Sequence, residues 1–215
     1  MGLHPFRRKR NPGVGGKTYL KFDSRDLALT AVFAALYAMI NVVQSVTIGN
    51  PTIYGPIQLR IADALIPLAA LIGWPVVGGV TIGCFLTNAY YFLGAPDIIL
   101  GPIANLIAAS LILRLRRRRL TACVVGALPI GVIVGSYLWF FFPFLSPPEV
   151  LSVIPAWAAF VVSITVSSLI ATAVIGYALL QVLSRKNILQ PLKSHGLKII
   201  DQEAKPETSP TSLSQ

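Results

Sequence analysis

Long apolar runs alternate with short connections rich in Gly, Pro or polar residues over most of this 215-residue chain. A helix needs about 20 apolar residues to cross a bilayer, with a range of about 17 to 25. Most of the runs approach or exceed that length, whereas one is short and stops at Gly73-Trp74-Pro75. The pattern predicts an all-α integral membrane protein whose six transmembrane helices occupy 27–46, 63–73, 76–93, 98–113, 120–142 and 155–183.

The composition supports a membrane protein, because 54% of the residues are hydrophobic and 12% are charged, against about 25% charged in a typical soluble domain. The formal charge of +10 invites a nucleic-acid interpretation. Every Lys and Arg except Arg60, however, lies in one of three clusters, at 7–25, 114–119 and 185–205. Segregation of this kind follows the positive-inside rule and argues against a nucleic-acid-binding face.

The three basic clusters also fix the predicted topology. Six crossings place all three on the cytoplasmic side, whereas a single crossing over 61–93 would export the 114–119 loop. We therefore expect a multi-pass protein of the cell membrane with both termini in the cytoplasm and a short second helix. The expected parts are a basic segment at 1–25, a six-helix membrane domain at 26–183, and a polar, disordered tail at 184–215.

Three charged residues interrupt the apolar region between positions 28 and 113, namely Arg60, Asp63 and Asp97. An ionisable residue at membrane depth costs about 2.5 to 3.5 kcal/mol on insertion scales, so such residues tend to be paired and functional. Arg60 and Asp63, three residues apart, can face each other at a helix start. The alternative is that Arg60 anchors at the headgroups while both aspartates serve helix N-termini, with Asp97 as an N-cap. The predicted topology places all three near the outer face.

Neutral polar side chains join these charges, mostly toward the outer helix ends. Each could simply bond a neighbouring helix. Together with the charges they suggest a pocket for a flat polar heterocycle, in which carboxylates accept N–H donors and aromatic rings stack. The predicted substrate-binding residues are Asn41, Gln44, Arg60, Asp63, Asn88, Tyr91, Asp97 and Asn105.

Pairs of small residues four apart allow helices to approach closely. The pairs at 79 and 83 and at 131 and 135 are glycines, for which internal packing is the simple interpretation. Ala31 and Ala35 lie on a helix that begins at the predicted cytoplasmic face. That pair is either internal or a docking site for a partner helix.

Catalytic and metal-binding motifs are not evident. The stretch NPGVGGKT lacks the first glycine of a P-loop, because Asn11 stands there. His4 and His195 lie in opposite tails, and Cys84 and Cys123 are interpreted as small buried hydrophobes. We therefore expect no metal, no cofactor and no enzymatic activity.

Residues 59–110 resemble the QueT family of predicted queuosine-precursor transporters. The matching motifs are an R-x-x-acid-A-L opening from Arg60 to Leu65, then Pro67, a G-C-x-x-x-N motif at 83–88, and an acid-I-x-x-G-x-x-A block at 97–104. Two departures bear on the exact substrate and not on its class. Asp63 stands where the family pattern usually has Glu, and Asn105 where it usually has Thr.

The resemblance implies the substrate-binding S component of an energy-coupling factor (ECF) transporter. Such a component has six helices and no ATPase of its own, and it docks by its first helix onto a scaffold (T) subunit coupled to two ATPases. The implied substrate is a 7-deazaguanine-type queuosine precursor or a similar small heterocycle. The alternative is a stand-alone secondary transporter of a small polar metabolite, and an intramembrane enzyme or a purely structural membrane protein is a more distant one.

Overall fold

The computed structural model describes residues 23–48, 59–141, 155–194 and 199, and every regular element within them is a helix. This confirms the all-α membrane class. The predictions made for 1–22 and for most of the polar tail lie outside the described residues, as do the connections at 49–58 and 142–154. Four helical runs are long and apolar enough to cross a bilayer: α1 (Ser24–Ile48), α5 (Ala95–Arg114), α6 (Arg119–Phe141) and the continuous run Ala156–Leu183.

Two shorter helical runs lie between α1 and α5. The first joins a 3-10 helix, η1 (Ile61–Leu68), to one turn of α-helix, α3 (Ala69–Ile72). The second, α4 (Trp74–Tyr90), has 17 residues and therefore spans about 26 Å. They are separated at Gly73, whose φ of 91° is accessible to glycine at little cost, and Pro75 occupies the first turn of α4. The stop predicted at this point is confirmed.

The first of these runs is short, as predicted, but it is wound more tightly than an α-helix. At about 2.0 Å per 3-10 residue and 1.5 Å per α residue, η1 and α3 together cover about 22 Å, less than a bilayer core of about 30 Å. η1 packs against a π-helical stretch, η3 (Ile170–Gly176), which joins α7 (Ala156–Leu169) to α8 (Tyr177–Leu183). A side chain at Gly176 would lie 2.7 Å from Cγ of Pro67, so this contact requires glycine.

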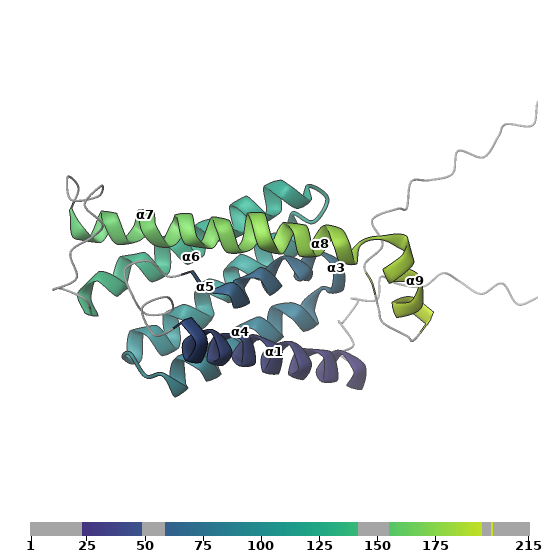
Figure 1. Ribbon diagram of the computed structural model, residues 1–215, viewed down its shortest axis with the longest axis horizontal. Coiled ribbons are helices and arrows are strands. Elements are labelled where there is room, and N and C mark those ends of the chain that lie inside the picture. Colours follow the sequence, from purple (N-terminus) through teal and green to yellow (C-terminus); the bar gives the residue numbers. More distant parts are fainter. Residues whose placement is uncertain (1–22, 49–58, 142–154, 195–198, 200–215) are drawn as a thin grey trace, which may run out of the picture.

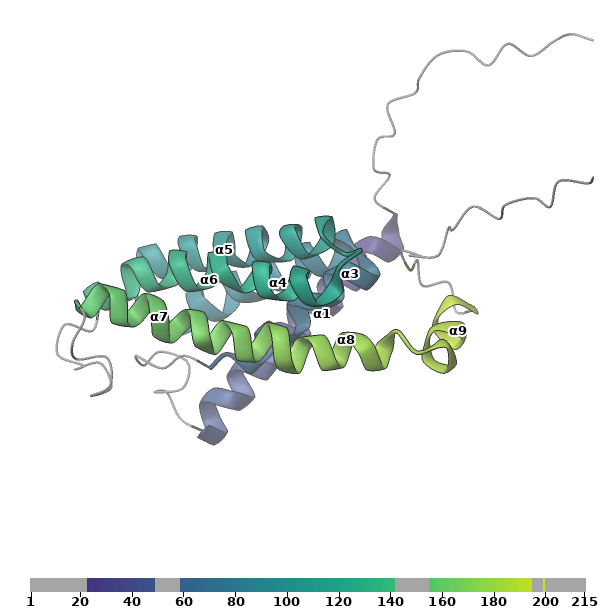
Figure 2. The ribbon, with the colours of Figure 1, turned by 90° about the horizontal axis from the view of Figure 1, so that it is seen from above.

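The helices lie along one long axis and pack in chain order, α1 on α4, α4 on α5, α5 on α6 and α6 on α7 (Figure 1). A view from above shows α7 and α8 as one rod that runs the length of the bundle (Figure 2). The predicted small-residue contacts are confirmed. Gly79 and Gly83 leave room for α1, and Gly131 and Gly135 leave room for α7.

The bundle is apolar on its exterior and carries polar groups in its interior. On α1, Val46 and Met39 are 79% and 57% exposed, whereas Asn41 is 1% exposed. A water-soluble helix shows the opposite distribution. The surface of the bundle therefore suits contact with lipid, and the buried polar positions mark its interior as the place where a polar ligand can be held.

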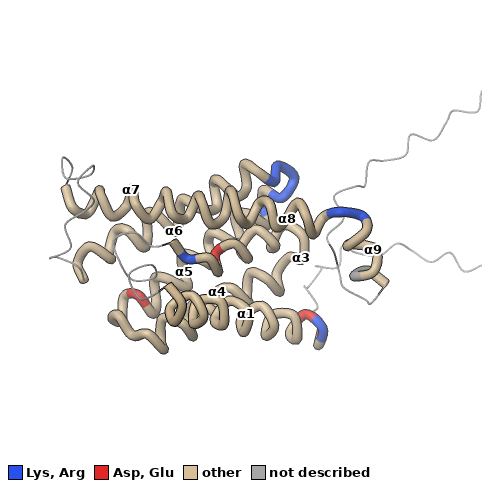
Figure 3. Tube along the Cα trace, in the orientation of Figure 1, with Lys and Arg blue, Asp and Glu red and all other residues tan. Residues whose placement is uncertain are grey.

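Basic segments gather at one end of the bundle, where the start of α1, the α5–α6 connection and the start of α9 (Lys186–Ser194) lie (Figure 3). This arrangement agrees with the parity argument made from the sequence. The membrane side that this end faces stays a prediction.

Candidate functional site

Arg60 directly precedes η1 and is buried, with 5% of its surface exposed. Figure 3 shows the charged start of η1 midway along the bundle, away from the basic end. Arg60 forms an ion pair with Asp97, whose Oδ1 lies 3.9 Å from Arg60 Nη2. Arg60 and Asp63, which the sequence allowed to face each other, form no ion pair within the described residues, and Asp63 is hydrogen-bonded by another helix.

Asp63 is held by Tyr37 on α1. The Tyr37 hydroxyl donates to Asp63 Oδ1 at 2.6 Å and accepts from Asn105 Nδ2 at 2.9 Å. All three residues are buried. One phenolic oxygen thus connects α1, η1 and α5.

Asp97 lies in the first turn of α5, but the N-cap of that helix is Gly94, and no side chain caps it. The interpretation of Asp97 as an N-cap is wrong. Its Oδ1 accepts from the Tyr137 hydroxyl of α6 at 2.7 Å, while its main-chain oxygen accepts from Asn88 Nδ2 at 2.8 Å. A side chain at Gly101 would collide with the Asn88 amide, so this glycine makes the bond from α4 to α5 possible.

Gln44 fixes the backbone on both sides of Arg60. Its Nε2 donates to the main-chain oxygen of Leu59, and its Oε1 accepts from the main-chain N–H of Ile61 at 3.0 Å. Asn41, one turn earlier on α1, donates from Nδ2 to the main-chain oxygen of Tyr37 at 3.0 Å. The Gln44 amide therefore orients the segment that carries the arginine, whereas the Asn41 amide bonds only its own helix.

Seven of the eight predicted binding residues are buried at these contacts, and Tyr91 is the exception. It lies at the C-cap of α4, is partly exposed, and packs edge-to-face on Tyr90 with ring centroids 4.9 Å apart. We use the name polar cluster for the seven together with the two tyrosines that bond the aspartates: Tyr37, Asn41, Gln44, Arg60, Asp63, Asn88, Asp97, Asn105 and Tyr137.

The two tyrosines were missed by the sequence analysis. Tyr37 carried a usable signal, because it precedes Asn41 by four residues and Gln44 by seven, on the same face of a helix. Tyr137 had no comparable signal, because its partner Asp97 is 40 residues away. Cys84 is buried, as predicted, and it also contacts the site, with Sγ 3.8 Å from Arg60 Nη1.

Among the described residues, three buried atoms of the polar cluster have no hydrogen-bond partner: Asn41 Oδ1, Arg60 Nη2 and Asp97 Oδ2. A buried polar atom without a partner is rare and costs about 1 to 3 kcal/mol. Two of the three atoms accept hydrogen bonds and one donates. The arrangement can therefore bind a ligand that offers two donors and one acceptor.

Ala31 and Ala35 lie on the exposed face of α1. The neighbouring face of the same helix, with Phe33 and Ala34, meets the glycines of α4. The predicted docking pair therefore stands apart from the internal contact of α1.

Comparison with known proteins gives a family. No curated protein and no solved structure matches the chain. The sequence model of the QueT transporter family matches residues 27–185, which include every residue of the polar cluster. The chain therefore belongs to the QueT transporter family, as the motifs in residues 59–110 indicated, and is a membrane transporter and not an enzyme.

Proposed function

We propose that this transporter is the substrate-binding S component of an ECF transporter and that its substrate is a queuosine precursor of the 7-deazaguanine type, or a similar small heterocycle. In this proposal six helices cross the membrane within 26–183, and both termini lie in the cytoplasm. The polar cluster is the substrate site. Tyr91, at the C-cap of α4, is proposed to cover a bound heterocycle with its ring.

The observation that carries the proposal is the set of three buried atoms that lack a hydrogen-bond partner in the described structure. A guanine-type edge presents ring N–H and exocyclic amino donors beside a carbonyl acceptor. Asn41 Oδ1 and Asp97 Oδ2 supply two acceptors, and Arg60 Nη2 supplies a donor. The hydrogen-bonding capacity of such a ligand thus complements what the cluster leaves open.

The charge of the cluster favours a cationic ligand. One arginine and two aspartates give a formal charge of −1 in a buried position. Burying an unpaired charge is costly, and a ligand of charge +1 neutralises it. Among 7-deazaguanines, the aminomethyl compound is cationic and the nitrile is neutral, so we expect the aminomethyl form to bind more tightly.

The proposed partnership with a scaffold subunit and two ATPases rests on the first helix and on the sequence. The exposed Ala31 and Ala35 give a partner helix a surface on which to approach α1 closely. The sequence offers no complete P-loop at 11–18, so energy from ATP requires another subunit.

Two measurements test the proposal. Calorimetry on the purified protein compares the aminomethyl and nitrile 7-deazaguanines with guanine and adenine. We expect the aminomethyl compound to bind at least about tenfold more tightly than the other three, a difference of about 1.4 kcal/mol. Absence of binding to every 7-deazaguanine rejects the substrate. Copurification from the native membrane with an ATPase-containing complex separates an S component from a stand-alone secondary transporter, which would purify and transport alone.

A further inference from the structure

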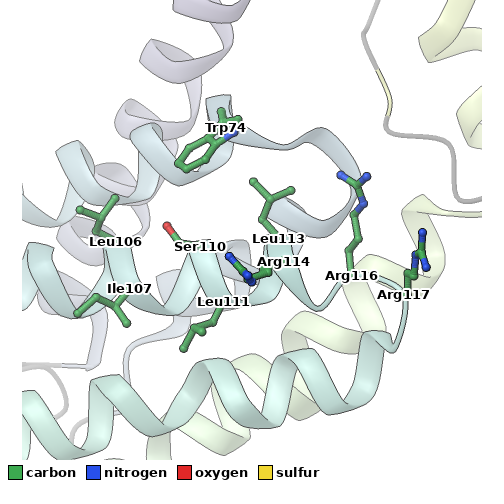
Figure 4. A pocket seen from close by; sticks show the side chains of 9 residues that line it. All are labelled: Trp74, Leu106, Ile107, Ser110, Leu111, Leu113, Arg114, Arg116 and Arg117. Atoms are coloured by element: carbon green, nitrogen blue, oxygen red, sulfur yellow. The ribbon is translucent and has the colours of Figure 1, made fainter. Parts of the chain in front are cut away.

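An open groove of about 990 Å³ lies on the bundle surface, and it shares no residue with the polar cluster. It runs along the C-terminal half of α5, with the start of α4 at its edge (Figure 4). The residues that line it are Trp74, Leu106, Ile107, Ser110, Leu111, Leu113, Arg114, Arg116 and Arg117.

The groove changes character along its length. Toward the middle of α5 its wall is apolar, and Leu106 and Ile107 are 40% and 38% exposed. At the end of α5 it carries Arg114, Arg116 and Arg117, and the residues that line it in the described part of the chain include no Asp or Glu. Figure 4 shows Arg114 beside Ser110, with Arg116 and Arg117 at the α5–α6 turn. An apolar wall with guanidinium groups at one end matches an amphiphile that has an anionic head.

The position in the bundle favours a lipid over a soluble anion. The arginines belong to the basic end of the bundle (Figure 3). Leu106 and Ile107 come about two turns earlier on α5, so the apolar wall lies further from that end than the arginines do. Trp74, 43% exposed, stands at the edge, and tryptophan is enriched at the depth of lipid headgroups. Guanidinium groups bind phosphate oxygens in bidentate geometry, which gives the site selectivity for a phosphate-bearing head.

We propose that this groove binds one anionic phospholipid of the adjacent leaflet. Its phosphate contacts Arg114, Arg116 and Arg117, and one acyl chain lies along Leu106 and Ile107. The inference requires only that the chain is embedded in a bilayer, so it does not depend on whether the polar cluster binds the substrate. The simpler account is that Arg114 stabilises the C-terminus of α5 and that the arginines only attract an anionic surface diffusely.

Fluorescence of Trp74 separates the two accounts. The double substitution Trp139→Phe and Trp157→Phe, at two exposed positions, leaves Trp74 as the tryptophan in the chain. This protein is placed in phosphatidylcholine bilayers that contain either brominated phosphatidylglycerol or brominated phosphatidylcholine. Each basic residue near an anionic surface raises the affinity for it roughly fivefold. With three arginines in the groove, brominated phosphatidylglycerol should quench Trp74 fluorescence with at least about tenfold higher apparent affinity than brominated phosphatidylcholine.

The decisive variant is Arg114→Gln/Arg116→Gln/Arg117→Gln, and the matched control is Arg118→Gln/Arg119→Gln/Arg185→Gln, which removes the same charge from arginines outside the groove. We expect the first to lose the preference and the second to keep it to within about threefold. Ile107→Asn, which makes the apolar wall polar and leaves the charge of the groove unchanged, should also weaken the preference. Equal quenching by both lipids, or equal loss in both triple variants, overturns the proposal. If added inorganic phosphate removes the preference for phosphatidylglycerol and chloride at the same ionic strength does not, the groove is a site for a soluble anion and not for a lipid.

Discussion

The hydroxyl of Tyr37 donates a 2.6 Å hydrogen bond to Oδ1 of Asp63, which lies 26 residues further along the chain. A hydroxyl that donates to an ionised carboxylate makes a bond about twice as strong as one between neutral groups. Because Asn105 donates to the same hydroxyl, the position of Asp63 depends on α1 and α5 together. Tyr137 holds Asp97 in a similar way from α6. Each aspartate of the polar cluster thus has a tyrosine of another helix that orients it.

Replacing Tyr37 by Phe should destabilise the protein even without ligand. The substitution removes one hydroxyl and leaves both Asp63 and Asn105 short of a buried partner, at about 1 to 3 kcal/mol for each group. Thermal unfolding in detergent should detect the loss. Tyr177→Phe is the control, because its hydroxyl bonds only the exposed Gln181 in the described structure. An equal change in both variants would show that the buried bond contributes nothing specific.

Substrate affinity should depend on the three charges of the cluster. We expect Asp63→Asn, Asp97→Asn and Arg60→Ala each to weaken binding by about ten- to a hundredfold, because a hydrogen bond to a charged group contributes about 1.5 to 3 kcal/mol. Arg60→Lys should rescue binding only in part, since an ammonium lacks the planar fork. Calorimetry on folded protein measures this, with Asp26→Asn at the start of α1 as the control. Wild-type affinity in all three variants would place the site elsewhere.

Gly101→Ala should weaken binding although the residue offers no side chain to a ligand. The added methyl group collides with the Asn88 amide and displaces it from the main-chain oxygen of Asp97. We expect a loss of about tenfold in affinity, equivalent to the net value of one hydrogen bond, about 1.4 kcal/mol. Gly78→Ala is the matched control, because its nearest neighbour is a Thr30 methyl group at 3.2 Å. Unchanged binding in Gly101→Ala would mean that Asn88 has no part in shaping the site.

Large side chains on the exposed face of α1 should separate transport from binding. Ala31→Trp and Ala35→Trp place a ring where a partner helix would approach, so uptake should fall while the affinity of the purified protein stays within about twofold. Val132→Trp, at an exposed position of α6, is the control and should leave uptake intact. Loss of affinity together with uptake would identify the alanines as part of the internal packing.

The orientation of the bundle can be checked by thiol labelling. Arg117→Cys lies at the basic end and Tyr90→Cys at the far end of α4, and both native positions are exposed. A membrane-impermeant reagent should label the second in intact cells and the first only after permeabilisation. The native thiols of Cys84 and Cys123 are buried and give a low background. The opposite labelling pattern would invert the topology.

The helices and the burial of the polar residues could be predicted from the sequence, because a bilayer requires long apolar runs and leaves few polar side chains within them. Uncharged apolar runs longer than about 17 residues are typical of membrane-spanning helices, and Gly73 with Pro75 marks an interruption directly. Asn41, Gln44 and Asn88 were found because a polar side chain in such a run needs an internal partner. Burial was therefore predictable, although binding by these residues stays a prediction.

The partners of these side chains were not accessible, because they are set by packing. Spacing alone allowed Arg60 to face Asp63, yet η1 is a 3-10 helix, and the carboxylate oxygen that lies 3.9 Å from the Arg60 guanidinium is that of Asp97 on α5. Nothing local distinguishes IADALIPL as 3-10 or IATAVIG as π-helical. Both conformations occur where the two segments contact each other, so they reflect tertiary structure and not propensity.

The hydrogen bonds between two side chains of the polar cluster join residues 26, 40 and 68 positions apart. Asp63 can meet Tyr37 early in synthesis, but Asp97 receives the Tyr137 hydroxyl only after α6 has entered the membrane. A nascent chain that stops before α6 therefore holds a buried carboxylate without that donor. At the proposed site, substrate binding would therefore report on assembly itself, because the polar cluster is complete only when α1, η1, α4, α5 and α6 have come together.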